Sequence, residues 1–301
     1  MWKKIGIGAM GLLGVVATGC SATATESDAL TTTQDGSIAV VEKTLTYTGY
    51  DPSTMACGKT QHLLVFEPAA PGKYPVMIYT VGTLGIYDAD EGRLVASEMA
   101  KRGFIAASAE YATADLQNDL ASCSTLDAKT ACIYGHRSTS AVNVLCNLAN
   151  ADCSRGVVAG GMSQGAAIAA FAQNYDPDVR AAWVMGFGGN ASCWRELPQD
   201  RLRIVDGTEQ KQIDLEGATG CYAFGHHCFR ANGSGWYMVQ DSELESGQSA
   251  HCYYVAPWPN GGALQWCNNY PPNGFDPGWA PPSTLPWSLD TNLDWLASFT
   301  N

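Results

Sequence analysis

A serine flanked by glycines is the feature of this sequence best suited to nucleophilic chemistry. In Gly161-Met162-Ser163-Gln164-Gly165 the spacing is G-x-S-x-G, which places a serine on a sharp turn between a strand and a helix. Glycine is needed two residues to either side because larger side chains would collide within the turn. The following helix would direct its N-terminal N–H groups at negative charge developing on a substrate oxygen. Because the chain has 32 glycines and the spacing can arise by chance, the surrounding elements decide its meaning.

The segments on either side of this motif have the character that the turn requires. Residues 156–160 form an apolar strand pattern, and residues 166–173 are mostly small helix formers. Further strands are expected at 38–47, 62–66, 74–80, 104–109, 181–185, 202–205 and 236–239, and further helices at 92–101, 138–147 and 292–299. Short apolar strands alternating with helices favour a mostly parallel sheet covered on both faces. No linker interrupts the pattern, so residues 38–301 are expected to form a single α/β domain.

With the motif in this setting, the chain resembles the α/β-hydrolase superfamily over nearly all of its mature length. More narrowly, it is similar to secreted bacterial serine esterases of the dienelactone-hydrolase, lipase and polyester-hydrolase kind. The resemblance implies an α/β-hydrolase fold and a substrate that is an ester, small molecule or polymer. It implies attack by Ser163, an acyl-enzyme intermediate, and neither cofactor nor metal. A triad-based amidase or peptidase, and a non-catalytic surface lipoprotein that binds glycan or peptide, are the alternatives.

The chain order of this superfamily, serine then acid then histidine, selects His251 as the general base. His251 follows the strand expected at 236–239 and a polar loop, and a disulfide at Cys252 would hold that loop rigid. The other four histidines lie before that strand: His62, His136, His226 and His227.

The acid of the expected triad is the least defined member. It belongs after the strand at 202–205, in Asp206-Gly207-Thr208-Glu209-Gln210. The family usually has aspartate about three residues after such a glycine, where this chain has Gln210, which has no charge to stabilise an imidazolium. Glu209 is therefore favoured, and Asp206 is the main alternative. Asp214 and Asp241 remain as further candidates.

Two backbone N–H groups are needed to bind a developing oxyanion. The residue after the nucleophile, Gln164, supplies one of them. By resemblance the other comes from the loop after the strand at 74–80, where many relatives have His-Gly-x and this chain has Val81-Gly82-Thr83. Thr83 is therefore the expected second donor, unless Gly82 forms a simple turn.

The N-terminus is expected to direct export. Lys3-Lys4 precede an uncharged apolar run that is too short to span a bilayer comfortably. The run ends at Cys20, and its end resembles a bacterial lipoprotein signal, which is cleaved before a cysteine that receives lipid. Residues 1–19 are thus expected to be a signal peptide and 20–37 a flexible tether to a membrane of the cell envelope. An ordinary signal peptide cleaved near residues 22–24, which would give a secreted protein, or a retained membrane anchor are the alternatives.

Ten cysteines remain of eleven when Cys20 is set aside, an even count that indicates disulfides in an exported chain. Proximity in sequence suggests four pairs: Cys123–Cys132, Cys146–Cys153, Cys221–Cys228 and Cys252–Cys267. Zinc is disfavoured because the chain has no C-x-x-C pair.

Composition narrows the range of partners. The chain is 46% hydrophobic, enough for a full core, and its formal net charge of −12 excludes the basic surface that nucleic acids require. Nothing implies an obligate protein partner. Aromatic residues near the C-terminus would either line a substrate groove or, as we favour, pack a loop: Trp258, Trp266, Tyr270, Trp279 and Trp287.

Overall fold

A central β-sheet organises the protein. The computed structural model describes residues 29–31, 38–83, 85–113, 123–187, 198–245, 247, 249–254 and 274–300. Within these residues the sheet has ten strands in the order β1-β2-β3-β5-β4-β6-β7-β8-β10-β9. The strands are β1 Ala29–Thr31, β2 Val40–Asp51, β3 Ala56–Pro68, β4 Val76–Thr80, β5 Ile105–Ala109, β6 Val157–Met162, β7 Val179–Met185, β8 Leu202–Asp206, β9 His227–Phe229 and β10 Gly235–Met238. The six neighbours from β5 to β10 are parallel, and β1, β2, β3 and β9 pair antiparallel at the two edges.

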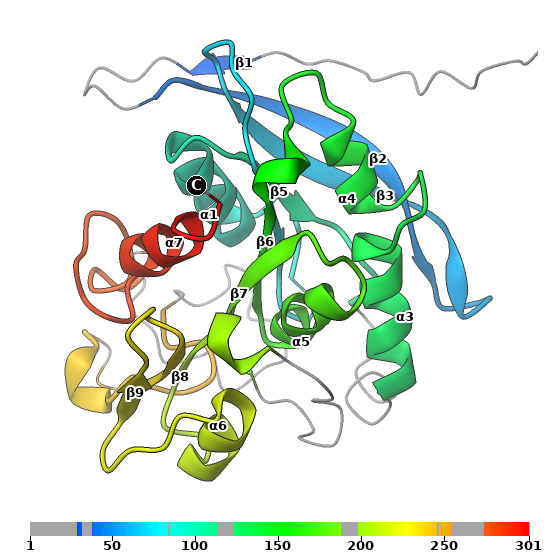
Figure 1. Ribbon diagram of the computed structural model, residues 1–301. Helices are drawn as coiled ribbons and strands as arrows, with labels where there is room; N and C mark the ends of the chain where they lie inside the picture. The colour runs from blue at the N-terminus through cyan, green and yellow to red at the C-terminus, as the bar shows by residue number, and fades with distance from the viewer. Residues whose placement is uncertain are drawn as a thin grey trace, which may run out of the picture.

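Helices cover both faces of this sheet (Figure 1). They are α1 Asp90–Lys101, α3 Cys123–Tyr134, α4 Ala141–Cys146, α5 Gln164–Phe171, α6 Gln212–Thr219 and α7 Leu289–Ala297, with 3₁₀ turns at Cys153–Arg155, Ala172–Asn174, Gln199–Arg201 and Asp241–Glu243. Helices α1 and α7 pack together on one face, and α3 packs with α4 and α5 on the other. Strands β4, β5, β6 and β8 are buried at every residue, as expected of parallel strands with helices on both sides.

The architecture confirms the α/β fold expected from the sequence, with a mostly parallel sheet and helices on both faces. Gly103 ends α1 with φ +83°, the left-handed stop that a glycine supplies. Four helices and strands were not expected: α3, α6 and the two short edge strands, β1 and β9. Ala29–Thr31, in the segment expected to be a tether, pairs antiparallel with β2.

The expected signal peptide and Cys20 lie outside the described residues, and no described helix has the length and hydrophobicity to cross a membrane.

Disulfides fasten the outer parts of the fold to one another. Cys146–Cys153 and Cys221–Cys228 are bonded as expected. The expected Cys123–Cys132 pair is wrong, because Cys132 is bonded to Cys57 and ties α3 to β3. Both cysteines lie on α3, where nine residues of helix span about 13 Å, beyond the reach of a disulfide.

Two further cysteines, Cys123 and Cys252, are also disulfide-bonded. The partner expected for Cys252, Cys267, lies outside the described residues.

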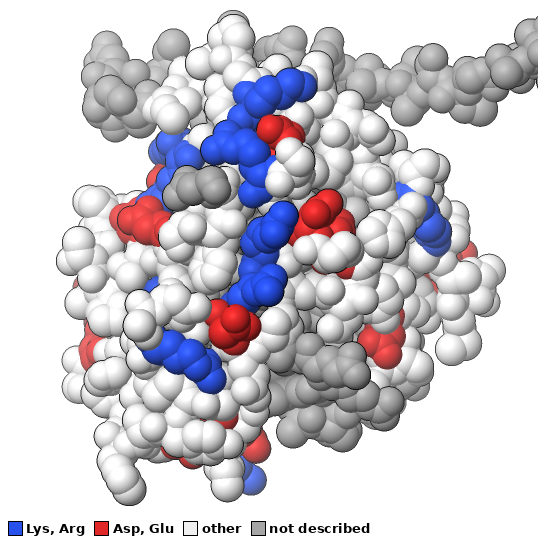
Figure 2. All heavy atoms as spheres, viewed as in Figure 1, with Lys and Arg blue, Asp and Glu red and all other residues white. Residues whose placement is uncertain are grey.

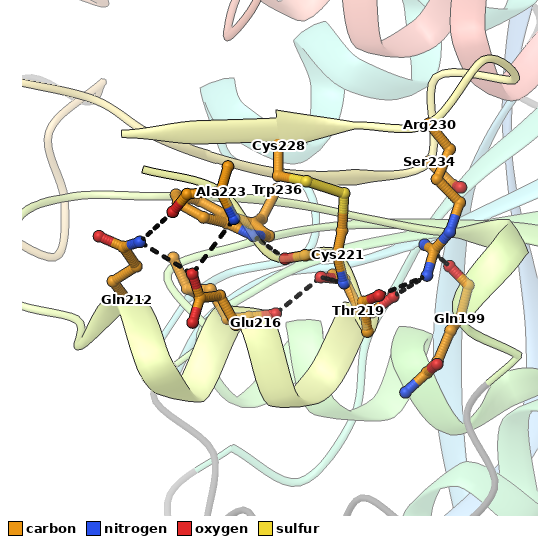
Figure 3. Close-up of a disulfide and its surroundings, with 12 residues drawn as sticks. Gln199, Gln212, Glu216, Thr219, Cys221, Ala223, Cys228, Arg230, Ser234 and Trp236 are labelled. Carbon is orange, nitrogen blue, oxygen red and sulfur yellow. Dashed lines mark hydrogen bonds between the residues drawn. A yellow bond between two sulfur atoms is a disulfide. The ribbon is translucent and has the colours of Figure 1, made fainter. Parts of the chain in front are cut away.

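The Cys221–Cys228 disulfide fixes the chain between α6 and β9 (Figure 3). The indole N–H of Trp236 donates to the Cys221 carbonyl, at 2.8 Å, so the bridge is attached to the core strand β10. On α6, the Gln212 side chain donates to the Ala223 carbonyl, at 2.7 Å.

Aromatic side chains near the C-terminus pack inside the protein. Trp279 and Trp287 are fully buried, and their rings contact those of Tyr254 and Tyr253, respectively. For these two tryptophans the packing interpretation holds. Trp258, Trp266 and Tyr270 lie outside the described residues.

Charged side chains contribute little to holding this fold together. On the face shown in Figure 2, Lys and Arg follow a narrow line with Asp and Glu beside them. The ion pairs between described residues include Arg93 with Glu42 and Arg102 with Asp290, both 2.5 Å and partly exposed. Such pairs contribute about 0–1 kcal/mol each, so the buried sheet and helices supply most of the stability.

Candidate active site

Ser163 occupies a strained turn between β6 and α5. Its φ is 55° and its ψ −119°, and among the described residues Met55 is the only other non-glycine residue with positive φ. The Ser163 N–H donates to the Met185 carbonyl on β7, at 2.8 Å, which fixes the turn to the neighbouring strand. A side chain held in such a backbone conformation requires support from its surroundings, and the G-x-S-x-G turn is a site where that strain positions a nucleophile.

The glycines on either side of Ser163 are required by close backbone contacts. A Cβ at Gly161 would lie 2.3 Å from the Gly165 carbonyl oxygen, and a Cβ at Gly165 would lie 2.1 Å from that of Thr80. The Thr80 hydroxyl donates to the Gly165 carbonyl, at 2.7 Å. The spacing of the motif therefore follows from the packing of α5 against the end of β4.

His251 is placed directly against the serine. Its Nε2 lies 2.8 Å from Ser163 Oγ, and its side chain is 15% exposed. A Cβ at Gly186, after β7, would lie 3.1 Å from His251 Cε1, a tight contact, and the φ of Gly186 is +56°, a conformation that favours glycine. The residue chosen by chain order is thus the one that contacts Ser163.

Glu209 lies on the other side of the His251 ring. Its Oε1 is 3.5 Å from His251 Nδ1, an ion-pair distance, and its side chain is 29% exposed. It follows β8, as the sequence predicts, and lies before α6.

The other acidic candidates have different partners. Asp206 is fully buried at the end of β8, and its Oδ1 accepts from the Phe187 N–H, at 2.7 Å. Burial, and next the charge of Glu209, raises the pKa of Asp206 well above its ordinary value. Asp241 accepts from the Ser249 N–H and hydroxyl, hydrogen bonds that lower its pKa. Asp214 lies on α6.

The loop expected to hold the second oxyanion donor lies against Ser163. A Cβ at Gly82 would lie 2.8 Å from Met162 Sδ and 3.3 Å from Ser163 Cβ. The Tyr111 hydroxyl donates to the Val81 carbonyl, at 2.7 Å, and fixes this loop from behind. Thr83 and Gln164 are both buried.

The sequence did not indicate a role for Lys129. It also did not indicate the contacts between the loop that carries Glu209 and the loop that carries His251. Lys129 lies on α3, and its Nζ lies 3.3 Å from the side-chain oxygen of Gln164. Its only sequence signal is a lysine inside a stretch with few charges, a weak indication when the helix is itself not predicted. Among the described residues, no group of three or more His, Cys, Asp or Glu is arranged to hold a metal ion.

The sequence matches no protein-family model and no curated protein. Among solved structures, a cold-adapted esterase from an Arctic intertidal metagenomic library, bound to PEG, is 14% identical with a TM-score of 0.47 over 66% of this chain and 84% of that chain. Its native structure is 14% identical with a TM-score of 0.42, over 60% and 79%. A hypothetical protein from Pseudomonas aeruginosa is 18% identical with a TM-score of 0.34, over 52% and 48%. These likenesses are distant, so the function must be argued from the site.

Proposed function

We propose that the protein is a serine hydrolase that cleaves carboxylic esters. The observation that carries the proposal is the 2.8 Å separation of Ser163 Oγ from His251 Nε2, with the serine held at positive φ between β6 and α5. A hydroxyl is a weak nucleophile until an adjacent base removes its proton, and this pair has the geometry for that transfer.

We assign a group to each step of the proposed reaction. Ser163 Oγ attacks the ester carbonyl carbon while His251 Nε2 takes its proton, and Glu209 orients the ring from Nδ1. The N–H groups of Gln164 and Thr83 bind the oxyanion of the tetrahedral intermediate. The C–O bond then breaks as His251 returns the proton to the leaving alcohol. Water, deprotonated by the same imidazole, then attacks the acyl carbon. The bond between the acyl carbon and Ser163 Oγ breaks, His251 returns the proton to Ser163 Oγ, and the acid is released.

The reaction is tested with matched ester and amide substrates. We expect 4-nitrophenyl esters of different acyl length to be hydrolysed and the corresponding 4-nitroanilides to be hydrolysed far more slowly. Ser163→Ala should abolish turnover without lowering the melting temperature, and Ser154→Ala, an exposed serine in the turn after α4, should leave turnover unchanged. Near wild-type turnover by Ser163→Ala would rule the proposal out, and faster cleavage of the anilides would make the protein an amidase.

The proposed place of action is outside the cytoplasm, at a membrane to which lipid on Cys20 anchors the chain. Disulfides between described residues support an oxidising compartment. Mass analysis of the N-terminal peptide from membrane fractions should show a lipidated Cys20, and Cys20→Ser should release the protein from the membrane. An unmodified cysteine in membrane-bound protein would contradict the lipid anchor.

A further inference from the structure

A lysine is buried beside the proposed oxyanion hole. Lys129, on α3, is 1% exposed. Its Nζ donates to the Ala112 carbonyl, which follows β5, and to the Gln164 side-chain oxygen at 3.3 Å. Taking an ammonium group out of water is costly and such lysines are rare, so this one requires an explanation.

The lysine is linked to both sides of the proposed oxyanion hole, directly on one side and through Tyr111 on the other. On one side it binds Gln164, whose N–H is one proposed donor and whose side chain is 1% exposed. On the other side its Nζ lies 5.7 Å from the centre of the Tyr111 ring. The Tyr111 hydroxyl donates to the Val81 carbonyl, two residues before Thr83, the other proposed donor. One ammonium group therefore contacts Gln164 directly and is linked to the loop of Thr83 through Tyr111.

We propose that Lys129 is a positioning residue that sets the two halves of the oxyanion hole relative to each other and places a positive charge behind them. The inference rests on the proposed hydrolase function. Donors fixed before reaction need no reorganisation when the carbonyl oxygen becomes negative, and a charge within a buried region acts more strongly than in water.

This role has a kinetic consequence that packing alone does not have. Negative charge develops on the substrate oxygen only on the way to the tetrahedral intermediate, so loss of Lys129 should lower kcat and leave KM nearly unchanged. A residue that only supported α3 would change the melting temperature, with kcat following the fraction of folded protein.

The variants Lys129→Met and Lys129→Gln, in the full exported chain, separate these roles. Lys129→Met keeps a side chain of similar length but removes the charge. Lys129→Gln also removes the charge but keeps a hydrogen-bond donor. Lys43→Met is the control. Lys43, on β2, is a largely buried lysine that pairs with Glu67 on β3. We expect Lys129→Met to lower kcat by roughly 10- to 100-fold, somewhat less than loss of an oxyanion donor. The kcat of Lys129→Gln should lie between those of Lys129→Met and the wild type, and Lys43→Met should keep wild-type kcat.

A second readout uses an arylboronic acid, which adds to the serine as a tetrahedral anion. Its inhibition constant should rise in Lys129→Met by about the factor by which kcat/KM falls. Gln164→Leu, which keeps the backbone N–H and breaks the contact from the other side, should lower kcat in the same direction. Because the two residues act through one contact, the double variant should lose less than the product of the single losses.

The outcomes distinguish the inference from the function on which it rests. A wild type that hydrolyses no ester and binds no boronate overturns the proposed function. An active wild type with folded Lys129→Met at full kcat and full boronate affinity overturns the role of Lys129 alone. If both Lys129 variants fail to fold, Gln164→Leu decides, and wild-type kcat and boronate affinity in that variant would overturn the inference.

Discussion

Thr208 and Ser249 join the loop that carries the proposed acid to the loop that carries the proposed base. Their hydroxyl oxygens lie 2.8 Å apart, and the Thr208 N–H donates to the Ser249 carbonyl, at 2.9 Å. Each residue is close in sequence to a proposed member of the triad: Thr208 precedes Glu209, and Ser249 comes two residues before His251. The relative position of acid and imidazole is therefore set by direct contacts between their loops.

Thr208→Val should weaken this connection while keeping the backbone contact. The hydroxyl bond is worth about 1 kcal/mol, so the unfolding free energy should fall by about that amount. We expect kcat to fall several-fold because the Glu209 carboxylate and the His251 imidazole are no longer held in a fixed relative position. Stopped-flow or steady-state kinetics with denaturant unfolding would measure both. Unchanged kcat in a destabilised variant would show that the connection serves folding alone.

Glu209→Gln and Asp206→Asn distinguish the two acids. Glu209→Gln should lower kcat by about 10²- to 10⁴-fold, as loss of a triad carboxylate does, because the amide cannot stabilise an imidazolium. Asp206→Asn keeps an oxygen to accept from the Phe187 N–H and should keep most of the activity. If Asp206→Asn proved the more damaging of the two, Asp206 would be the acid.

Asp206→Asn should also change how stability depends on pH. The folded-state pKa of Asp206 is raised, so the folded protein binds its proton more tightly than the unfolded chain does. Its contribution to stability is therefore full below the unfolded pKa of about 3.9 and is lost as pH rises through the folded value. Relative to wild type, Asp206→Asn should gain melting temperature at pH 7 to 8 compared with pH 4. A difference that is constant over this range would contradict the raised pKa.

Most of the architecture follows from local pattern, and the parts that do not are those fixed by contacts distant in sequence. The strand at 157–162, the turn at Ser163 and helix α5 are all encoded by neighbouring residues. Helix α3 is not, because it buries Lys129 and Thr130 along with its apolar residues and so has no clear amphipathic pattern. The pairing of Cys132 with Cys57 depends on the same helix and was missed for the same reason.

The candidate site likewise contains residues that the sequence indicates and one that only a contact distant in sequence fixes. Ser163 is marked by its own motif, and His251 by its order in the chain after the last parallel strand. The segment 206–210 holds two carboxylates three residues apart, and its sequence does not say which one turns toward the imidazole. That choice is made by the Phe187 N–H, which binds Asp206 and leaves Glu209 facing His251.

The disulfides should differ in their contribution to stability according to the length of chain they close. Cys57–Cys132 closes 75 residues and Cys221–Cys228 closes 7. On the chain-entropy scale their removal should cost roughly 4 and roughly 2 kcal/mol, respectively. Paired Cys→Ser variants compared by denaturant unfolding would give the two values. A larger loss for the Cys221–Cys228 pair would show that native packing around Trp236 outweighs chain entropy.

The central claim, that Ser163 is an activated nucleophile, is tested most directly by a fluorophosphonate probe followed by mass mapping of the labelled peptide. The exported, disulfide-bonded protein should carry one adduct, on Ser163, and His251→Ala should lose it while remaining folded. An intact protein that carries no adduct, or carries it on another residue, would contradict the account.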